Sequence, residues 1–173
     1  MLSRFRREEP SHAAADRLHA AIARRAREGV FHTAFAVPDT IDGRFDLFTL
    51  HAFLIMEALK EKGDMGDAIA TQLATAIFAG FEDALRDLGV GDFGLSRRIK
   101  AMANAFYGRL EAYANARGDD AFTEALIRNL YRGDAGERAR AEALARYASA
   151  ARLWLVPSDV TRGAADFGPF PKV

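Results

Sequence analysis

Residues 81–113 read FEDALRDLGVGDFGLSRRIKAMANAFYGRLEAY, and this stretch decides the fold that the sequence predicts. Its first part ends an apolar face of helical spacing that begins near Ile69 and reaches Leu88. Three glycines then fall within residues 89–94, where they permit positive φ values that other residues resist. The second part predicts a helix over residues 95–117. The stretch as a whole therefore predicts two helices joined by a tight turn.

The rest of the chain repeats this pattern of apolar helical segments that end at glycine or proline. Ser11, Asp42 and the Asp119-Asp120 pair are the predicted N-caps of three helices. Helices are predicted over residues 11–29, about 42–62, 64–88 and 95–117, from 119–120 onward, and over 137–155, with an irregular connection over 30–42. No strand pattern occurs. The predicted fold class is all-α: a single-domain bundle of about six helices with an extended C-terminal tail.

Both ends of the chain are predicted to lie outside the helical domain, which is expected to span residues 11–156. Residues 1–10 predict a flexible basic N-terminus. It is either a frayed end or a short amphipathic contact for an anionic membrane surface. Residues 157–173 predict an extended strap in which Phe167 and Phe170 cover the bundle. A disordered end is the alternative that the sequence leaves open.

Composition places the chain among single-domain globular proteins and excludes several classes of function. The 24 Lys and Arg residues balance 24 Asp and Glu residues, which argues against a general nucleic-acid binder. The absence of cysteine excludes disulfides, cysteine-based zinc sites and cysteine nucleophiles. No apolar run reaches the ~18–20 residues that span a bilayer, and no secretory signal pattern is present. Residues 45–59 are apolar on almost every face, which predicts the central core helix; an apolar face for a partner is the alternative.

The sequence contains no catalytic or metal-binding constellation. His12 and His19, seven residues apart, are a weak metal pair, and other His/Glu ligand motifs are absent. The segment GVGDFG, residues 89–94, resembles a phosphate-binding glycine motif, but it follows a helix instead of the strand that this motif requires. His51 lies in an apolar helix, so we expect a core histidine that is hydrogen-bonded to a carbonyl. Axial ligation of haem by His51 or His19 is the alternative.

Three cations lie in the predicted first turn of the helix over residues 95–117, where the helix dipole disfavours each by some tenths of a kcal/mol. They are either part of an ion-pair network with Asp87 and Asp92 or a cationic patch that meets a protein or a lipid. Met102 and Phe106, on the opposite face, are expected in the core. In the second interpretation, the partner-binding residues are Asp92, Arg97, Arg98, Lys100, Asn104, Tyr107 and Arg109.

The run from Gly89 to Tyr113 resembles the hallmark of the ubiquinol–cytochrome c chaperone family. Leu95 and Ser96 stand where a Val-Gly pair is common in that family. Residues 45–59, with a Leu-His pair at their centre, also resemble a hydrophobic helix of the family, and the similarity extends over about residues 31–131. The shared residues are Leu88, Gly89, Val90, Gly91, Asp92, Gly94, Arg98, Ile99, Lys100, Met102, Ala105, Phe106, Tyr107, Gly108 and Arg109, together with Leu50-His51.

The resemblance implies an all-α assembly chaperone, without catalysis or a cofactor of its own, for newly made cytochrome b of respiratory complex III. It also implies a partner factor and the ribosome as further contacts, and help with haem acquisition by the client. Such a chain is expected in the cytoplasm, near the inner face of the inner membrane, or in the mitochondrial matrix if it is organellar. A haem-handling helical bundle and a generic helical protein-interaction domain remain as alternatives.

Overall fold

A computed structural model describes residues 5–170, with the side chains of residues 5–9 and of Phe93 outside the description. The described part contains seven α-helices, two short 3₁₀ helices and no strand, which confirms the predicted all-α bundle with a tail. Two parts of the predicted ends lie outside the described residues. They are residues 1–4 of the flexible N-terminus and residues 171–173 of the strap. The helices are α1 (Phe5–Ala26), α2 (Val30–Thr33), α3 (Ile41–Lys60), α4 (Gly63–Asp87), α5 (Asp92–Asn115), α6 (Gly118–Asn129) and α7 (Arg138–Leu155), with 3₁₀ helices at Ala135–Glu137 and Val160–Arg162.

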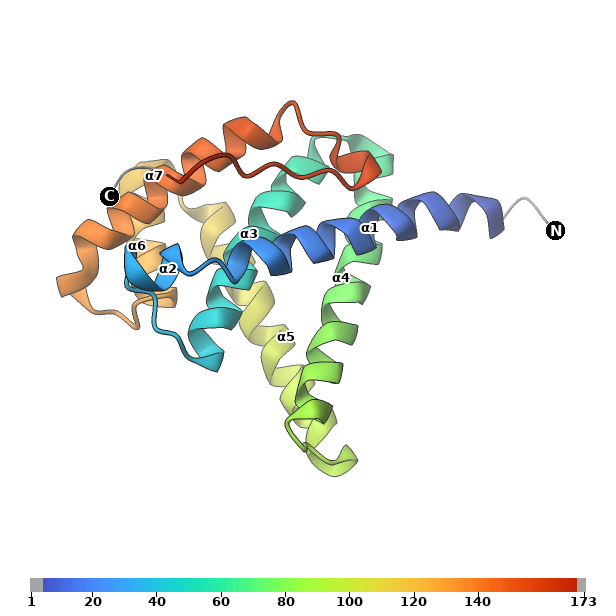
Figure 1. Cartoon of the computed structure of the whole chain (residues 1–173), viewed down its shortest axis with the longest axis horizontal. Coiled ribbons are helices and arrows are strands. Elements are labelled where there is room, and N and C mark those ends of the chain that lie inside the picture. The colour runs from blue at the N-terminus through green and yellow to red at the C-terminus, as the bar shows by residue number, and fades with distance from the viewer. Residues whose placement is uncertain (1–4, 171–173) are drawn as a thin grey trace.

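Helix α3 lies at the centre of the bundle, as its apolar sequence predicted. It contacts α1, α4, α5 and α7, which surround it in Figure 1. Leu47, Leu50, Leu54 and Ile55 have essentially no exposed surface. A helix that is apolar all round can bury each of its faces only when neighbours cover every side, and this arrangement provides them.

The start of α3 differs from the prediction, which placed the N-cap at Asp42. Helix α3 begins at Ile41, and the Thr40 hydroxyl caps it by accepting a hydrogen bond from the Gly43 amide at 3.1 Å. A Cβ on Gly43 would lie 2.0 Å from the Pro38 carbonyl oxygen, so the incoming loop packs directly on this turn. The predicted irregular connection before it contains the short helix α2, whose Phe31 is buried.

Two other helix starts also differ from the predictions. Helix α1 begins at Phe5 and not at Ser11, and it contains Pro10. Pro10 is the sixth residue of α1, where a proline removes one helix hydrogen bond and its ring crowds the carbonyl four residues earlier. Helix α6 begins at Gly118 with Arg117 as the N-cap residue, and no side chain caps it. The Asp119-Asp120 pair instead lies inside the first turn, where acidic side chains interact favourably with the helix dipole.

Helices α4 and α5 form an antiparallel hairpin that projects from the rest of the bundle, towards the bottom of Figure 1. The turn between them is shorter than predicted, because α5 begins at Asp92 and not at Leu95. Only residues 88–91 remain outside the two helices, and Gly89 has a φ of +79° that reverses the chain. Leu85, before this turn, and Leu95, after it, are both buried.

The residues after α7 form an extended strap that crosses the bundle (Figure 1). Phe167 is buried, and its ring centroid lies 5.2 Å from that of His51. The Phe170 ring stacks on Tyr147 at 5.6 Å, and the Arg25 guanidinium lies 3.7 Å above the Phe170 ring. The strap through Phe170 is thus part of the core, not a disordered end.

Candidate partner-binding site

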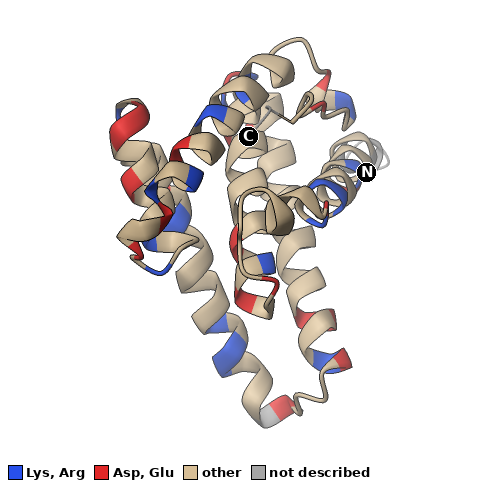
Figure 2. Cartoon of the chain, turned by 60° about the vertical axis from the view of Figure 1, so that its left-hand side comes forward, with Lys and Arg blue, Asp and Glu red and all other residues tan. Residues whose placement is uncertain are grey.

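The predicted partner-binding residues separate into an exposed group and an internal group. Arg97, Arg98, Lys100, Asn104 and Tyr107 are all exposed on α5. In Figure 2, a group of basic residues lies in the half of α5 nearer the tip of the hairpin. The other two members of the predicted set, Asp92 and Arg109, are held by contacts within the chain.

The three exposed cations of α5 make no ion pair within the part of the chain that the structure describes. Their expected partner Asp92 binds Arg86 of α4 instead, at 2.9 Å, and Asp87 pairs with no described residue. Because α5 begins at Asp92, Arg97 and Arg98 lie in its second turn and not in its first. The dipole effect falls off within the first turn, so the expected local penalty largely disappears. The cations are free to meet a partner.

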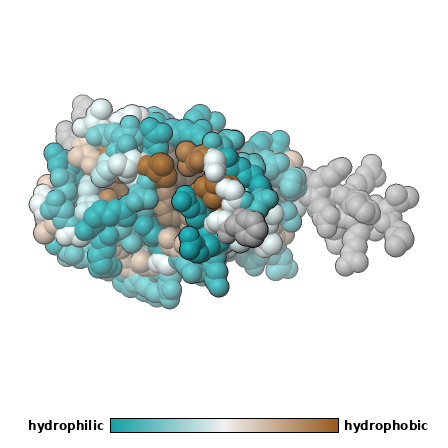
Figure 3. Space-filling model, turned by 90° about the horizontal axis from the view of Figure 1, so that it is seen from below, coloured by the Kyte–Doolittle hydropathy of each residue, from teal (hydrophilic) through white to brown (hydrophobic). Residues whose placement is uncertain are grey.

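Tyr107 joins the charged face of α5 to a cluster of aromatic rings between the helices. Its side chain is 51% exposed, yet its ring lies 5.7 Å from Phe78 of α4 and 5.4 Å from buried Phe106. Phe81 continues the cluster towards α3, and it is only partly buried. Figure 3 shows apolar residues near the middle of the face seen from below, which is the side on which the hairpin projects. This side therefore offers both charge and apolar surface.

Arg109 is turned into the molecule and is not part of the open face. Its Nε atom lies 2.8 Å from Oδ1 of Asp46 on α3, and its side chain is only 17% exposed. The same guanidinium donates a hydrogen bond to the Ala105 carbonyl at 3.0 Å and lies 5.2 Å from the Phe45 ring centroid. These contacts assign Arg109 to the attachment of α5 to α3, which corrects its placement among surface contacts.

Asp46 is the fully buried carboxylate of this pair, and a second cation reaches it from the other side. Nη2 of Arg132, in the turn after α6, lies 2.9 Å from Oδ2 of Asp46. Arg132 adopts a φ of +56°, a left-handed conformation that a non-glycine residue rarely takes. Burial raises the pKa of the Asp46 carboxyl, and the Arg109 and Arg132 guanidiniums oppose that rise. The sequence alone did not reveal this cluster, although Asp46, one of two acids in the apolar run of residues 45–59, is a usable signal.

His51 is the core histidine that the sequence predicted. Its Nδ1 lies 2.7 Å from the Leu47 carbonyl oxygen, which can only accept, so Nδ1 carries the proton. Nε2 then accepts from the Tyr147 hydroxyl at 2.8 Å, and that hydroxyl accepts from Arg25 Nε at 2.9 Å. Burial lowers the pKa of His51 to about 4 and keeps the ring neutral. Both ring nitrogens are engaged, so ligation of haem iron by His51 requires one of these hydrogen bonds to break.

Comparison with known proteins agrees with the resemblance of the sequence. The chain matches the family described as ubiquinol-cytochrome C chaperone over residues 33–159, which extend from the end of α2 past α7. The chain belongs to this family. A crystal structure of the Cbp3 homolog from Brucella abortus matches it with a TM-score of 0.79 and 34% sequence identity, over 96% of this chain and 97% of that one. No curated protein sequence matches the chain.

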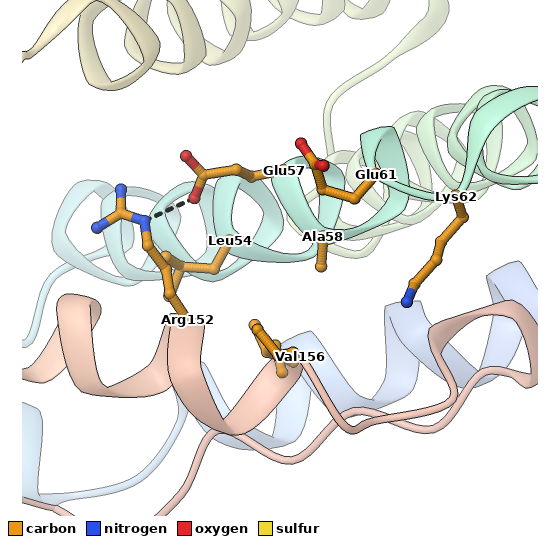
Figure 4. A pocket seen from close by; sticks show the side chains of 8 residues that line it. Leu54, Glu57, Ala58, Glu61, Lys62, Arg152 and Val156 are labelled. Atoms are coloured by element: carbon orange, nitrogen blue, oxygen red, sulfur yellow. Dashed lines mark hydrogen bonds and ion pairs between the residues drawn. The ribbon is translucent and has the colours of Figure 1, made fainter.

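This ubiquinol-cytochrome c chaperone also has an open hollow away from the hairpin, between the C-terminal halves of α3 and α7 (Figure 4). The hollow has a volume of about 460 Å³, and Leu54, Ala58 and Leu155 supply apolar lining. An ion pair between Glu57 and Arg152, at 2.6 Å, crosses one end of it. The other charged side chains in the lining are Glu61 and Lys62.

Two further observations bear on how this family member works. Among the described residues, no group of three or more His, Cys, Asp or Glu side chains is arranged to hold a metal ion. None of the helices in residues 5–170 combines the length and the apolar composition that crossing a bilayer requires. The α4–α5 hairpin with its exposed charged face is the strongest candidate for the functional site.

Proposed function

We propose that the chain is a non-catalytic assembly chaperone that binds newly made cytochrome b and promotes assembly of the ubiquinol–cytochrome c reductase complex. The observation that carries the proposal is membership of the ubiquinol-cytochrome c chaperone family over residues 33–159. The structural match to the Brucella abortus Cbp3 homolog along nearly the whole chain supports it. A second assembly factor or the ribosome is a further partner in this proposal, which places the chain in the cytoplasm at the inner membrane face, or in the matrix of an organelle.

The face of the α4–α5 hairpin supports a binding role, because it combines features that protein interfaces use. Aromatic residues and arginine are enriched in such interfaces, and Tyr107 lies exposed beside three free cations. Asp92 is 84% exposed and is held in place by Arg86, so it limits the cationic surface at the tip. We therefore assign client contact to Arg97, Arg98, Lys100, Asn104 and Tyr107, with Asp92 at the edge and Arg109 in a supporting position.

Site-specific photocrosslinking in cells tests this function. A photoreactive residue at Tyr107 or Asn104 is expected to crosslink to cytochrome b during complex assembly. The matched control is the same residue at Arg146, which is exposed on α7. Deletion of the gene is expected to lower the amounts of cytochrome b and of the assembled complex. Normal levels of both after deletion, together with no crosslink to cytochrome b from any position, would overturn the proposal.

A further inference from the structure

One buried carboxylate joins α5 to a turn that lies outside the α4–α5 hairpin. Each oxygen of Asp46 faces one guanidinium: Oδ1 lies 2.8 Å from Nε of Arg109 on α5, and Oδ2 lies 2.9 Å from Nη2 of Arg132 in the turn after α6. Asp46 has no exposed surface, and a charge that is cut off from water is costly unless nearby charges or donors compensate it. The attachment of α5 to α3 is therefore complete only when Arg132 is in place.

The backbone at Arg132 does not require an arginine. Arg132 has a φ of +56° and the next residue, Gly133, has a φ of +81°. Glycine adopts such values without the steric cost that an arginine incurs. A strained residue that is kept in place points to a role for its side chain. The Arg132 guanidinium contacts Asp46, the exposed carboxylate of Asp42 at 3.6 Å and the Asn129 carbonyl at 3.3 Å, and Asp46 is the buried charge among these partners.

The turn that carries Arg132 is anchored on both sides of this residue. The hydroxyl of buried Tyr131 donates a hydrogen bond to the Phe35 carbonyl at 2.8 Å. The Gly133 amide donates one to the Ile127 carbonyl of α6 at 2.9 Å. The guanidinium of Arg132 is thus presented to Asp46 from a fixed backbone, and support of this kind holds a site in its geometry.

The exposed face of α5, which carries Arg97, Asn104 and Tyr107, depends on the angle at which α5 leaves α3. Arg97 precedes Arg109 by twelve residues, which places it about 18 Å further along the helix at 1.5 Å per residue. A rotation of α5 by about 10° at Arg109 therefore moves Arg97 by about 3 Å. This part of α5 belongs to the half of the hairpin that projects from the bundle (Figure 1). A small change at the base is thus a large displacement of the face.

We propose that Arg132 is a positioning residue for the exposed face of α5. Its guanidinium completes the charge balance of Asp46, which holds Arg109 and with it the orientation of the α4–α5 hairpin on α3. The inference rests on the proposed function where it concerns the client. It adds a residue that acts on client contact from the turn after α6, outside the hairpin that makes the contact.

The distance between two spin labels measures this orientation without a client. The chain has no cysteine, so Leu88→Cys at the tip of the hairpin and Arg146→Cys on α7, both at exposed positions, can be labelled specifically. In the full chain, Arg132→Gln and Arg132→Gly are each expected to shift the distance distribution, or to broaden it, by about 3 Å. Because glycine favours the left-handed turn, a change shared by both variants follows from the lost guanidinium and not from the backbone.

Two controls separate the Asp46 contact from other effects of charge. Arg128→Gln removes an exposed cation of α6, and Asp42→Asn removes the exposed partner of Arg132. Both are expected to leave the distance distribution as it is in the unmodified chain. In co-purification, Arg132→Gly is expected to lower the capture of cytochrome b by about threefold, and Arg128→Gln is expected to leave capture unchanged.

The two measurements fail separately. An unchanged distance in both Arg132 variants, an equal change in Arg128→Gln, or full capture by Arg132→Gly despite a changed distance would overturn the inference and leave the proposed function standing. If the distance changes as expected but the unmodified chain captures no cytochrome b, the proposed function is overturned and Arg132 still positions the hairpin.

Discussion

Nε of Arg109 lies 2.8 Å from Oδ1 of Asp46, a side chain with no exposed surface. The pair joins α5 to the central helix α3, close to the base of the α4–α5 hairpin. Removing one partner of a buried ion pair leaves the other charge without compensation, which is far more costly than losing an exposed pair. The position of the hairpin relative to the bundle therefore depends on this contact.

Asp46→Asn is expected to lower the free energy of unfolding by about 3 kcal/mol, because Arg109 then remains buried without a counter-charge. Urea denaturation at neutral pH measures the change. Asp42→Asn is the matched control, since the Asp42 carboxylate is 83% exposed and lies 3.6 Å from Arg132. The control is expected to stay within about 0.5 kcal/mol of the unmodified chain. Equal effects of the two substitutions would contradict a buried role for Asp46.

The neutral His51 predicts that stability falls in mild acid. The pKa of His51 is about 4 in the folded chain, whereas that of an unperturbed histidine is about 6.5, so between these limits the unfolded chain binds a proton that the folded chain does not. The contribution of neutral His51 to the free energy of unfolding is complete above pH 6.5. It is lost as the pH falls, and the free energy of unfolding then decreases by at most about 1.4 kcal/mol per pH unit. Burial also lowers the pKa of His19, so His19 too contributes to the loss of stability in acid.

Urea denaturation at pH 7, 6 and 5 measures this slope. His51→Gln is expected to flatten it, whatever its effect on the absolute stability at pH 7. An unchanged slope in the His51 variant would show that His51 takes up a proton equally in the folded and unfolded chains.

Two glycines with similar backbone conformations predict different costs of substitution. Gly133 and Gly168 have φ values of +81° and +70°, and an alanine at either is strained by roughly 1–2 kcal/mol. At Gly168 the added Cβ would also lie 2.2 Å from the Trp154 ring, whereas at Gly133 it would meet nothing within 4 Å. We therefore expect Gly168→Ala to lower the Tm clearly more than Gly133→Ala. Equal shifts by calorimetry would mean that the strap is not seated against Trp154.

The free cations of α5 predict a charge-dependent interaction with the client. Replacement of Arg97, Arg98 and Lys100 together by Gln is expected to reduce capture of cytochrome b and to make the remaining capture less sensitive to salt. The matched control replaces three other exposed cations, Arg24, Arg128 and Arg146, by Gln and changes the net charge equally. Capture is measured by co-purification at low and high salt. A similar loss in both triple variants would point to net charge and not to the α5 face.

Much of the fold could be predicted because it follows from local patterns. The apolar faces of residues 45–59 placed α3 at the centre, and the glycines after Leu88 marked the turn of the hairpin. The N-cap of α3 could not be chosen in this way, since Thr40 and Asp42 both have suitable side chains. In the folded chain the Thr40 hydroxyl accepts the hydrogen bond from the Gly43 amide, and Asp42 lies inside the first turn.

The candidate site was only partly predictable, for a different reason. Helical spacing separates the faces of α5, but it does not tell which neighbour covers each face. Arg109 follows Tyr107 by two residues, yet it faces Asp46, which lies 63 positions earlier in the sequence. The exposure of Arg97 and Lys100 was predictable from their side of the helix. The internal role of Arg109 required the crossing of α3 and α5.

The strap also affects when the core around His51 can be covered during synthesis of the chain. The ring cluster that contains Phe31 and Tyr147 is closed by Phe170, and Arg25 donates a hydrogen bond to the Gly168 carbonyl across 143 positions of sequence. Until residue 170 has left the ribosome, these groups have no covering segment. Contacts of such long sequence separation form slowly and late in folding. The nascent chain therefore exposes the His51 network until the strap has emerged, and the strap then covers it.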